Sequence, residues 1–468
     1  MDAFLTSSFG TFVMTLWHGV LSAPSWHNFT SLAYGWALAY GRQTITTYLW
    51  GSGAAQVKHF SRYDAFLGGA LYQRRYQLWA RVIRCGATLV PADAVIDVRL
   101  DDATMKKSGR HIQGGAHYRN GAGTARQKYR TLWGIHLVWA IMRIPLHIWP
   151  GHHLSLPIGL ELYLKETLAH KLKVPYRSRS ALARRIVDHV AAELPTRAIR
   201  VATDGGYAPQ AFLRDLPGNV NVVGRFLLTA KLYQLPPTRV KGQRGAPRKK
   251  GARIGSPTTL ATPASAWHPP PHEAGAFIQA WGGLWHSVFP GRLIRVVVVW
   301  RPHRAGPTQP HGSTAFGRLK PLEAFVSPDV ALSVPTLVAT YDARWAIEIA
   351  IRDGHAYDGV AQAQGRKVER IVGANTLRLL LAAARTLWCI VTSAQQADVA
   401  LQRLRPWYRH KVAPSQFDVA WACREVLQEA GIFPIPRFFR CSPVSTLKMA
   451  KGQSAEYSEI TTSHSPED

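Results

Sequence analysis

The chain has 468 residues, of which 47% are hydrophobic, which excludes a wholly disordered protein and allows two or three domains with a large core. Lys and Arg number 57 against 28 Asp and Glu, so the formal net charge is +29. Such an excess is typical of proteins that bind nucleic acid, with an anionic membrane surface as the weaker alternative. Four widely spaced cysteines without a CxxC motif favour a cytoplasmic protein with reduced thiols over a disulfide framework.

The first 90 residues are predicted to form a helical N-terminal domain. Apolar residues recur there at helical spacing, and the start of the chain lacks the basic segment of a signal peptide. From about residue 92 the pattern changes to short apolar runs that are typical of strands. The predicted strands cover residues 94–100, 131–141, 144–149, 198–203, 219–225 and 293–300, and a helix is predicted over 178–194.

Two segments interrupt this order. Residues 235–275 are rich in Pro, Gly and positive charge, and 239–253 contains seven basic residues and no acid. Such a run favours contact with a polyanion over a merely solvated loop, and Arg248, Lys249 and Lys250 are candidate DNA contacts. A second loop is expected over 301–319.

The C-terminal part of the chain is predicted to be helical before it becomes disordered. The apolar run 377–394 contains Arg378 and Arg385, so it is predicted to be a core helix and not a membrane span. The polar tail after Lys451 is predicted to be disordered. Strands, a helix, more strands, an insertion and closing helices together predict a mixed α/β fold.

Three carboxylates are expected where such a core would bring them together. Asp102 is expected just past the end of one strand, Asp204 at the end of another, and Glu348 on a helix. Converging negative charges repel unless a divalent cation holds them, and Mg²⁺ prefers oxygen ligands. Two such ions roughly 4 Å apart can activate the attacking oxygen and stabilise the leaving one. Each aspartate alone is also explained as a cap or turn, and Asp101 is the alternative first ligand if Asp102 points away.

Residues 341–355 are predicted to form one largely buried helix. At 100° per residue, Tyr341, Arg344, Glu348 and His355 fall within about 60° of one another, so they would form a single polar stripe. A metal and a phosphate would satisfy such a stripe. An ordinary Arg344–Glu348 salt bridge is the alternative interpretation.

These motifs resemble a cut-and-paste insertion-sequence transposase of the DDE type, in the group marked by a Tyr-x2-Arg-x3-Glu-x6-Lys signature. Here the signature is Tyr341, Arg344 and Glu348, with His355 where the family has Lys. The Asp-x-Thr block is matched by Asp102-Ala103-Thr104, and the Asp-Gly-x-Tyr block by Asp204-Gly205-Gly206-Tyr207. Arg225 and Leu232-Tyr233 also match the family's stretch after the next strand. The likeness spans roughly residues 30–400.

The resemblance implies an RNase H-like core interrupted by an insertion, which hydrolyses transposon ends and transfers the freed 3′-OH into target DNA. Asp102, Asp204 and Glu348 would be catalytic and hold two Mg²⁺ ions, for which Mn²⁺ substitutes. Tyr341, Arg344 and His355 would contact DNA. The partners would be double-stranded DNA and a second copy of the chain in a homodimer, and no membrane is expected. The location would be the cytoplasm, in association with the nucleoid. The boundaries would be 1–90 for the helical domain, here a candidate for DNA-end binding, 91–225 and 292–400 for the core, 226–291 for the insertion, and 401–468 for the C-terminal segment.

Two other functions remain open at this point. One is a metal-dependent nuclease with the same core and no strand transfer. The other is a DNA-binding protein whose catalytic centre has decayed, against which the intact Asp102, Asp204 and Glu348 argue. The basic stretch 239–253 fits all three functions.

Overall fold

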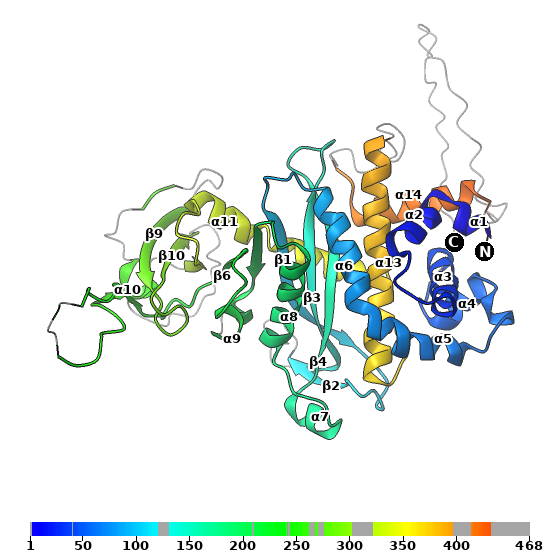
Figure 1. The fold of residues 1–468 in the computed structure, drawn as a ribbon, viewed down its shortest axis with the longest axis horizontal. Helices are drawn as coiled ribbons and strands as arrows, with labels where there is room; N and C mark the ends of the chain where they lie inside the picture. Colours follow the sequence, from blue (N-terminus) through cyan, green and yellow to red (C-terminus); the bar gives the residue numbers. More distant parts are fainter. Residues whose placement is uncertain are drawn as a thin grey trace, which may run out of the picture.

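One mixed sheet of 11 strands runs through the molecule in this computed structural model, with helices packed around it (Figure 1). Its main path has the order β2-β3-β1-β5-β6-β11-β10-β9-β7-β8, and β4 pairs with β3 beside β2. The predicted α/β class is therefore confirmed. The structure describes residues 2–39, 41–119, 131–207, 210–239, 241, 244–261, 267–269, 276–301, 322–395 and 413–431.

The described strands and helices have the following bounds. The strands are β1 (Ile96–Lys106), β2 (Ala116–Arg119), β3 (Thr131–Pro145), β4 (His153–Tyr163), β5 (Ile199–Thr203), β6 (Val220–Arg225), β7 (Leu232–Tyr233), β8 (Arg253–Gly255), β9 (Phe277–Leu284), β10 (Leu293–Trp300) and β11 (Leu322–Ser327). The helices are α1 (Asp2–Thr6), α2 (Ser8–Trp17), α3 (Ala23–Leu38), α4 (Ile45–Gly51), η1 (Ala54–Gln56), α5 (Phe60–Phe66), η2 (Leu67–Leu71), α6 (Tyr72–Thr88), α7 (Glu166–Lys171), α8 (Arg179–Glu193), η3 (Gly205–Tyr207), α9 (Gln210–Leu213), α10 (Pro257–Leu260), α11 (Val334–Asp342), α12 (Trp345–Ala356), α13 (Val368–Gln395) and α14 (Gln416–Glu429).

Strand β1 is the centre of the half of the sheet that carries the predicted carboxylates. It pairs antiparallel with β3 on one side and parallel with β5 on the other, and β5 in turn pairs parallel with β6. Strand β4 continues antiparallel beyond β3. Parallel strands need a crossover connection, and α8 lies in the crossover between β4 and β5. It begins where predicted because the Ser178 hydroxyl accepts a hydrogen bond from the Ala181 N–H at 3.2 Å.

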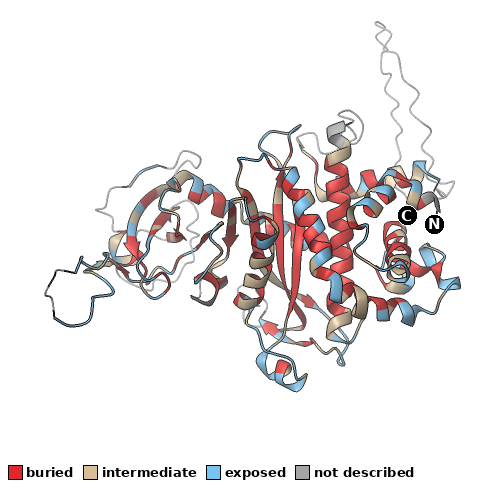
Figure 2. Cartoon of the chain, viewed as in Figure 1, coloured by how far each residue is buried: buried red, intermediate tan, exposed pale blue. Residues whose placement is uncertain are grey.

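Helices α8 and α12 cover opposite faces of this half-sheet. Successive residues of a strand point to opposite faces, so Trp139 and Ala140 of β3 face different helices. Gly354 of α12 lies against the Trp139 ring, and Ile186 of α8 lies against Gly159, the β4 partner of Ala140. Buried residues concentrate in the central strands and along α13 (Figure 2). Each face of the half-sheet is therefore a packed layer of the core.

The rest of the sheet extends from β6 through β11, β10 and β9 to the short strands β7 and β8. Strand β10 was predicted from its run of β-branched residues, whereas β4 and β11 were not predicted as strands. The stretch 226–291, predicted as an insertion, contributes β7, β8 and β9 to the same sheet. The predicted loop 301–319 lies almost wholly outside the described residues, as does the polar tail.

The N-terminal helices α1 to α6 confirm the predicted helical start of the chain. Helices α2, η2 and α6 pack with α13, whose Gly373 approaches the backbone of Leu67 in η2 too closely for any side chain. Helix α13 is long and apolar enough to cross a membrane between Val368 and Thr392, but 94% of its most apolar window is buried inside the protein. It is therefore a core helix, as its two arginines predicted.

Candidate active site

The pairing register places Asp101 and Asp204 at the same edge of the sheet. Leu100 of β1 pairs with Thr203 of the parallel strand β5, so the next residues along the two strands are Asp101 and Asp204. Thr203 likewise pairs with Gly224 of β6, and Arg225 follows. Residues at the same register of neighbouring strands lie on one face of the sheet. Two acids and one arginine therefore form a row across β1, β5 and β6, where the parallel pairing of these strands ends.

Arg344 connects this row to the helix that bears Glu348. Its guanidinium donates to Asp101 Oδ2 at 2.9 Å and to Glu348 Oε1 at 2.6 Å. Burial, together with the negative charges of Asp102 and Asp204, raises the pKa of Asp101 to about 7, although the Asp102 N–H and Arg344 lower it. Asp101 is thus a desolvated acid with other acids near it, and Arg344 supplies the positive charge between it and Glu348.

Asp102 lies on the opposite face of β1 and has different partners. Its carboxylate lies 2.6 Å from His136 Nε2 and 3.1 Å from Arg179 of α8, and accepts a hydrogen bond from the Tyr207 hydroxyl at 2.5 Å. Burial raises the pKa of Asp102, but these hydrogen bonds and the Arg179 charge outweigh it and lower the pKa to about 2. Asp102 makes no ion pair with Arg344 among the described residues. It is a stably ionised carboxylate in a buried network.

The position of the two aspartates within β1 differs from the prediction. The strand was expected to end before Asp102, but β1 continues to Lys106 because its pairing with β3 extends from Val98 to Lys106. The parallel pairing with β5 does end at Leu100. Both aspartates are consequently inside a strand, and strand alternation separates their side chains. The prediction that Asp102 converges with Glu348 is therefore wrong, because Asp102 lies on the face of β1 away from Glu348. Asp101, the alternative first ligand, lies on the nearer face.

The predicted single helix over 341–355 is wrong, because the chain forms two helices there. Helix α11 ends at Asp342, Arg344 is the residue before α12, and the Arg344 N–H donates to the Tyr341 carbonyl at 2.8 Å in a tight turn. Tyr341 consequently lies on a different helix from Glu348. Tyr341 is 9% exposed, its ring packs on Phe325 with 4.2 Å between ring centroids, and burial raises the pKa of its phenol. His355 is exposed in the last turn of α12.

The predicted DNA contacts of the basic stretch are all on the surface. Arg248, Lys249 and Lys250 are exposed in the segment between β7 and β8. The Lys250 ammonium lies 4.2 Å from the centre of the Tyr233 ring, which is a cation–π contact. No described ion pair neutralises these three cations. They remain accessible to a polyanion.

Several residues that shape the site were not predicted from the sequence. Arg301, which is 1% exposed, lies 2.5 Å from Glu323 and 3.1 Å from Asp342, and so ties β11 to the end of α11. Glu323 also lies 3.6 Å from Arg225. His136 and Arg179 hold Asp102 from β3 and α8. The sequence shows His136, Arg179 and Arg301 only as single charged or polar residues, and this does not reveal their partners.

Among the described residues, no three His, Cys, Asp or Glu side chains are close enough together to hold a metal ion. The carboxylate oxygens of Asp101, Asp204 and Glu348 are nevertheless the hard donors that Mg²⁺ prefers. Arg344 occupies the space between two of them. The donor set therefore fits a divalent cation only if Arg344 releases Asp101 and Glu348.

No protein-family model matches this sequence, and a search of curated proteins finds no match either.

Proposed function

We propose that the chain is a metal-dependent DNA transposase of the DDE type, with Asp101, Asp204 and Glu348 as its catalytic carboxylates. The observation that carries this proposal is the register that places Asp101 and Asp204 side by side, with Arg344 joining Asp101 to Glu348. The choice of Asp101 over Asp102 follows from the face of β1 on which each side chain lies. Asp102 then acts as a positioning residue, because it binds Tyr207 just after Asp204.

The proposal includes an RNase H-like core. Its support is a central strand β1 with antiparallel neighbours β3 and β4 on one side and parallel neighbours β5 and β6 on the other. A helix in the crossover, α8, covers one face, and a later helix that bears an acid, α12, covers the other. The stretch 226–291, with β7, β8 and β9, then forms the insertion that separates the last acid from the first two.

The chemistry proposed for this site is the transfer of a phosphoryl group of DNA. Divalent cations held by Asp101, Asp204 and Glu348, two Mg²⁺ or Mn²⁺, would activate a water or a 3′-hydroxyl and offset the charge that develops at phosphorus. Arg344 would pass from the two carboxylates to a DNA phosphate, which its planar guanidinium binds with two hydrogen bonds. Arg225, in the same row, would supply a second cation for the backbone.

The partner under this proposal is double-stranded DNA, which a homodimer binds. The protein would be cytoplasmic and associated with the nucleoid. The +29 charge supports it, because neutralising DNA phosphates releases counterions and drives binding. His355 is an exposed candidate for a further phosphate contact, as are Arg248, Lys249 and Lys250.

The test is to incubate the full chain with Mg²⁺ and duplexes that carry candidate terminal-repeat sequences, and to separate nicked, fully cut and joined products. Joined products indicate transposition, whereas cutting without joining indicates a nuclease. Binding without any cleavage would indicate a decayed enzyme. The matched variants are Asp101→Asn and Asp102→Asn, which remove one charge each from neighbouring positions. We expect the first to abolish cleavage and the second to reduce it. Full activity of Asp101→Asn would overturn the assignment.

A further inference from the structure

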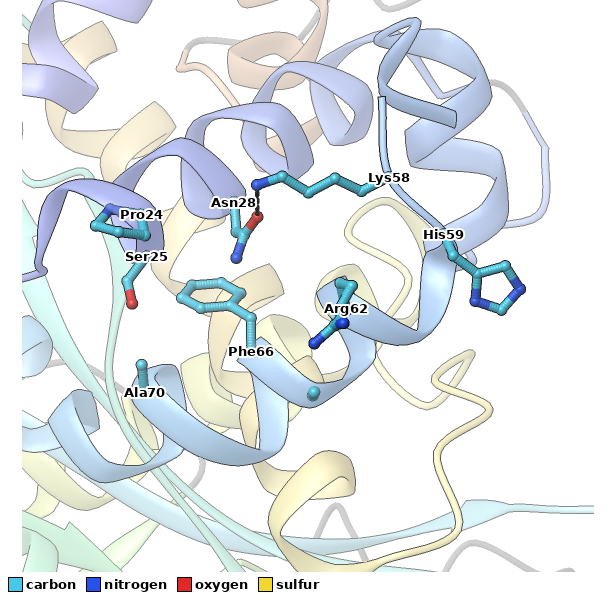
Figure 3. Close-up of a pocket in the computed structure, with 9 residues that line it drawn as sticks. Pro24, Ser25, Asn28, Lys58, His59, Arg62, Phe66 and Ala70 are labelled. Atoms are coloured by element: carbon cyan, nitrogen blue, oxygen red, sulfur yellow. Dashed lines mark hydrogen bonds between the residues drawn. The ribbon is translucent and has the colours of Figure 1, made fainter. Parts of the chain in front are cut away.

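A hollow of about 520 Å³ lies between α3 and α5 in the N-terminal helical domain (Figure 3). It shares no residue with the candidate active site. Its lining residues are Pro24, Ser25, Asn28, Lys58, His59, Arg62, Ala65, Phe66 and Ala70. Two of these residues are cations and none is an acid. The hollow is therefore positively charged.

Lys58 and Arg62 have no acidic partner in the described part of the chain. The half-buried Lys58 donates a hydrogen bond from its ammonium to Asn28 Oδ1 at 3.2 Å, which is a neutral group. Arg62 is exposed, and its guanidinium points into the hollow in Figure 3, whereas His59 points away. The nearest acid along the chain, Asp64, forms an ion pair with Arg370 of α13. Two cations without an acid beside them attract an anion, so an anion in this hollow would be stabilised.

The surrounding backbone favours an anion and holds the hollow in shape. Pro24 and Ser25 belong to the first turn of α3, whose N-terminal dipole end is positive and whose cap makes no side-chain hydrogen bond. The buried ring of Phe66 lies in the hollow opposite Asn28 in Figure 3. Gly68, just after α5, packs against Arg370. The hollow thus has one buried wall at Phe66, and its two cations lie toward its open side.

We propose that this hollow is a phosphate-binding site, and that a backbone phosphate of duplex DNA fills it. Lys58 supplies a point charge from one side, the Arg62 guanidinium supplies two donors, and the Ser25 hydroxyl supplies a third group. The choice of DNA as the source of the phosphate rests on the proposed function. The site would be a second DNA contact, separate from the carboxylates, through which the N-terminal helices hold the duplex.

Lysine footprinting of the full chain tests this site. An amine-reactive reagent is applied alone, with a short duplex, and with inorganic phosphate at the same phosphate concentration, and mass spectrometry gives the rate of modification at each lysine. We expect the duplex to slow the modification of Lys58 several-fold and inorganic phosphate to slow it far less. Lys171 and Lys173, exposed at the end of α7, are the reference positions and should be unaffected.

The outcomes separate this site from the proposed function. Protection of Lys249 and Lys250 without protection of Lys58 would refute the site and leave DNA binding intact. Equal protection of Lys58 by inorganic phosphate would refute duplex DNA as the ligand. Protection of Lys58 in a protein that cuts no DNA would support the site and count against the enzyme. Protection of no lysine would overturn both.

A pair of double variants provides an independent measurement. Each DNA phosphate that the protein neutralises adds roughly 0.9 to the slope of log affinity against log salt. Lys58→Gln with Arg62→Gln removes the contacts with the one phosphate in the hollow, so it should lower the slope by about 0.9. Lys171→Gln with Lys173→Gln removes the same charge from a surface outside the hollow and should leave the slope unchanged. Equal reductions for the two pairs would mean that only total charge matters, which would contradict a site.

Discussion

Asp101 and Asp102 are neighbours in sequence, yet their ionisation should change the stability of the fold with opposite sign. The pKa of Asp101 is raised to about 7 from an ordinary value of 3.8. The folded state therefore favours its protonated form, and this stabilisation is fully present below pH 4 and lost as the pH rises through 7. At about 1.4 kcal/mol per pKa unit, the loss amounts to about 4 kcal/mol.

Asp102 has the reverse dependence, because its pKa is lowered to about 2. The folded state favours its ionised form, so its contribution is present above pH 4 and lost as the pH falls through 2. The same conversion gives a stabilisation of about 2 kcal/mol at neutral pH. Asn has nearly the same volume as Asp, so each substitution removes the charge with little change in packing.

The assay is urea unfolding of the metal-free protein at intervals from pH 5 to pH 8, where the free energy of unfolding is obtained by linear extrapolation. Asp101→Asn should be more stable than the wild type at pH 8. Its free energy of unfolding should also decrease much less between pH 5 and pH 8 than that of the wild type. Asp102→Asn should be less stable by about 2 kcal/mol at every pH in that range. If Asp101→Asn kept the full pH dependence of the wild type, the burial and acid repulsion assigned to Asp101 would be wrong.

Three further predictions concern DNA. Asp204→Asn should abolish cleavage and leave affinity for DNA nearly unchanged in a binding titration, since it removes one carboxylate charge and leaves the basic surface intact. Neutralising Arg248, Lys249 and Lys250 should lower the slope of log affinity against log salt by roughly 0.9 for each DNA phosphate that these side chains bind, and an unchanged slope would exclude this segment from the interface. His355→Lys should retain or increase end cleavage, most clearly between pH 7.5 and pH 8.5, because an ammonium keeps its charge to about pH 10 and an imidazole does not. Identical pH profiles for the two proteins would argue against a phosphate contact at this position.

Strands β1, β3, β5, β6 and β10 and helix α8 were predictable because local patterns determine them. The β-branched run of β10 and the capping serine of α8 each indicate their element without help from the rest of the chain. Strand β11 escaped prediction because Glu323 interrupts its short apolar run, and because its partner β6 is distant in sequence. The break between α11 and α12 also escaped, because Ala343 and Arg344 are good helix formers and the turn is imposed by tertiary packing.

The choice between Asp101 and Asp102 could not be made from the sequence for a simple geometric reason. A strand turns successive side chains to opposite faces, so a one-residue shift in register moves every side chain to the other side. The motif Asp-x-Thr selects Asp102, and Thr104 does share its face, since both contact His136. Only the pairing of Leu100 with Thr203 shows that Asp101 is the neighbour of Asp204.

Arg344 shows that the structural and functional interpretations of the 341–355 segment are compatible. The salt bridge with Glu348 that was the ordinary alternative is present, with 2.6 Å between the charged atoms. The same guanidinium lies 2.9 Å from Asp101 on another part of the fold. Two half-buried acids that would otherwise repel are therefore held near each other by an arginine before any cation arrives. If a divalent cation and a DNA phosphate bound together, they would replace the ion pairs of Arg344. The cation would bind the two carboxylates, and the phosphate would bind the Arg344 guanidinium. Metal and DNA should consequently bind with positive coupling, each favouring the other by releasing the same ion pairs.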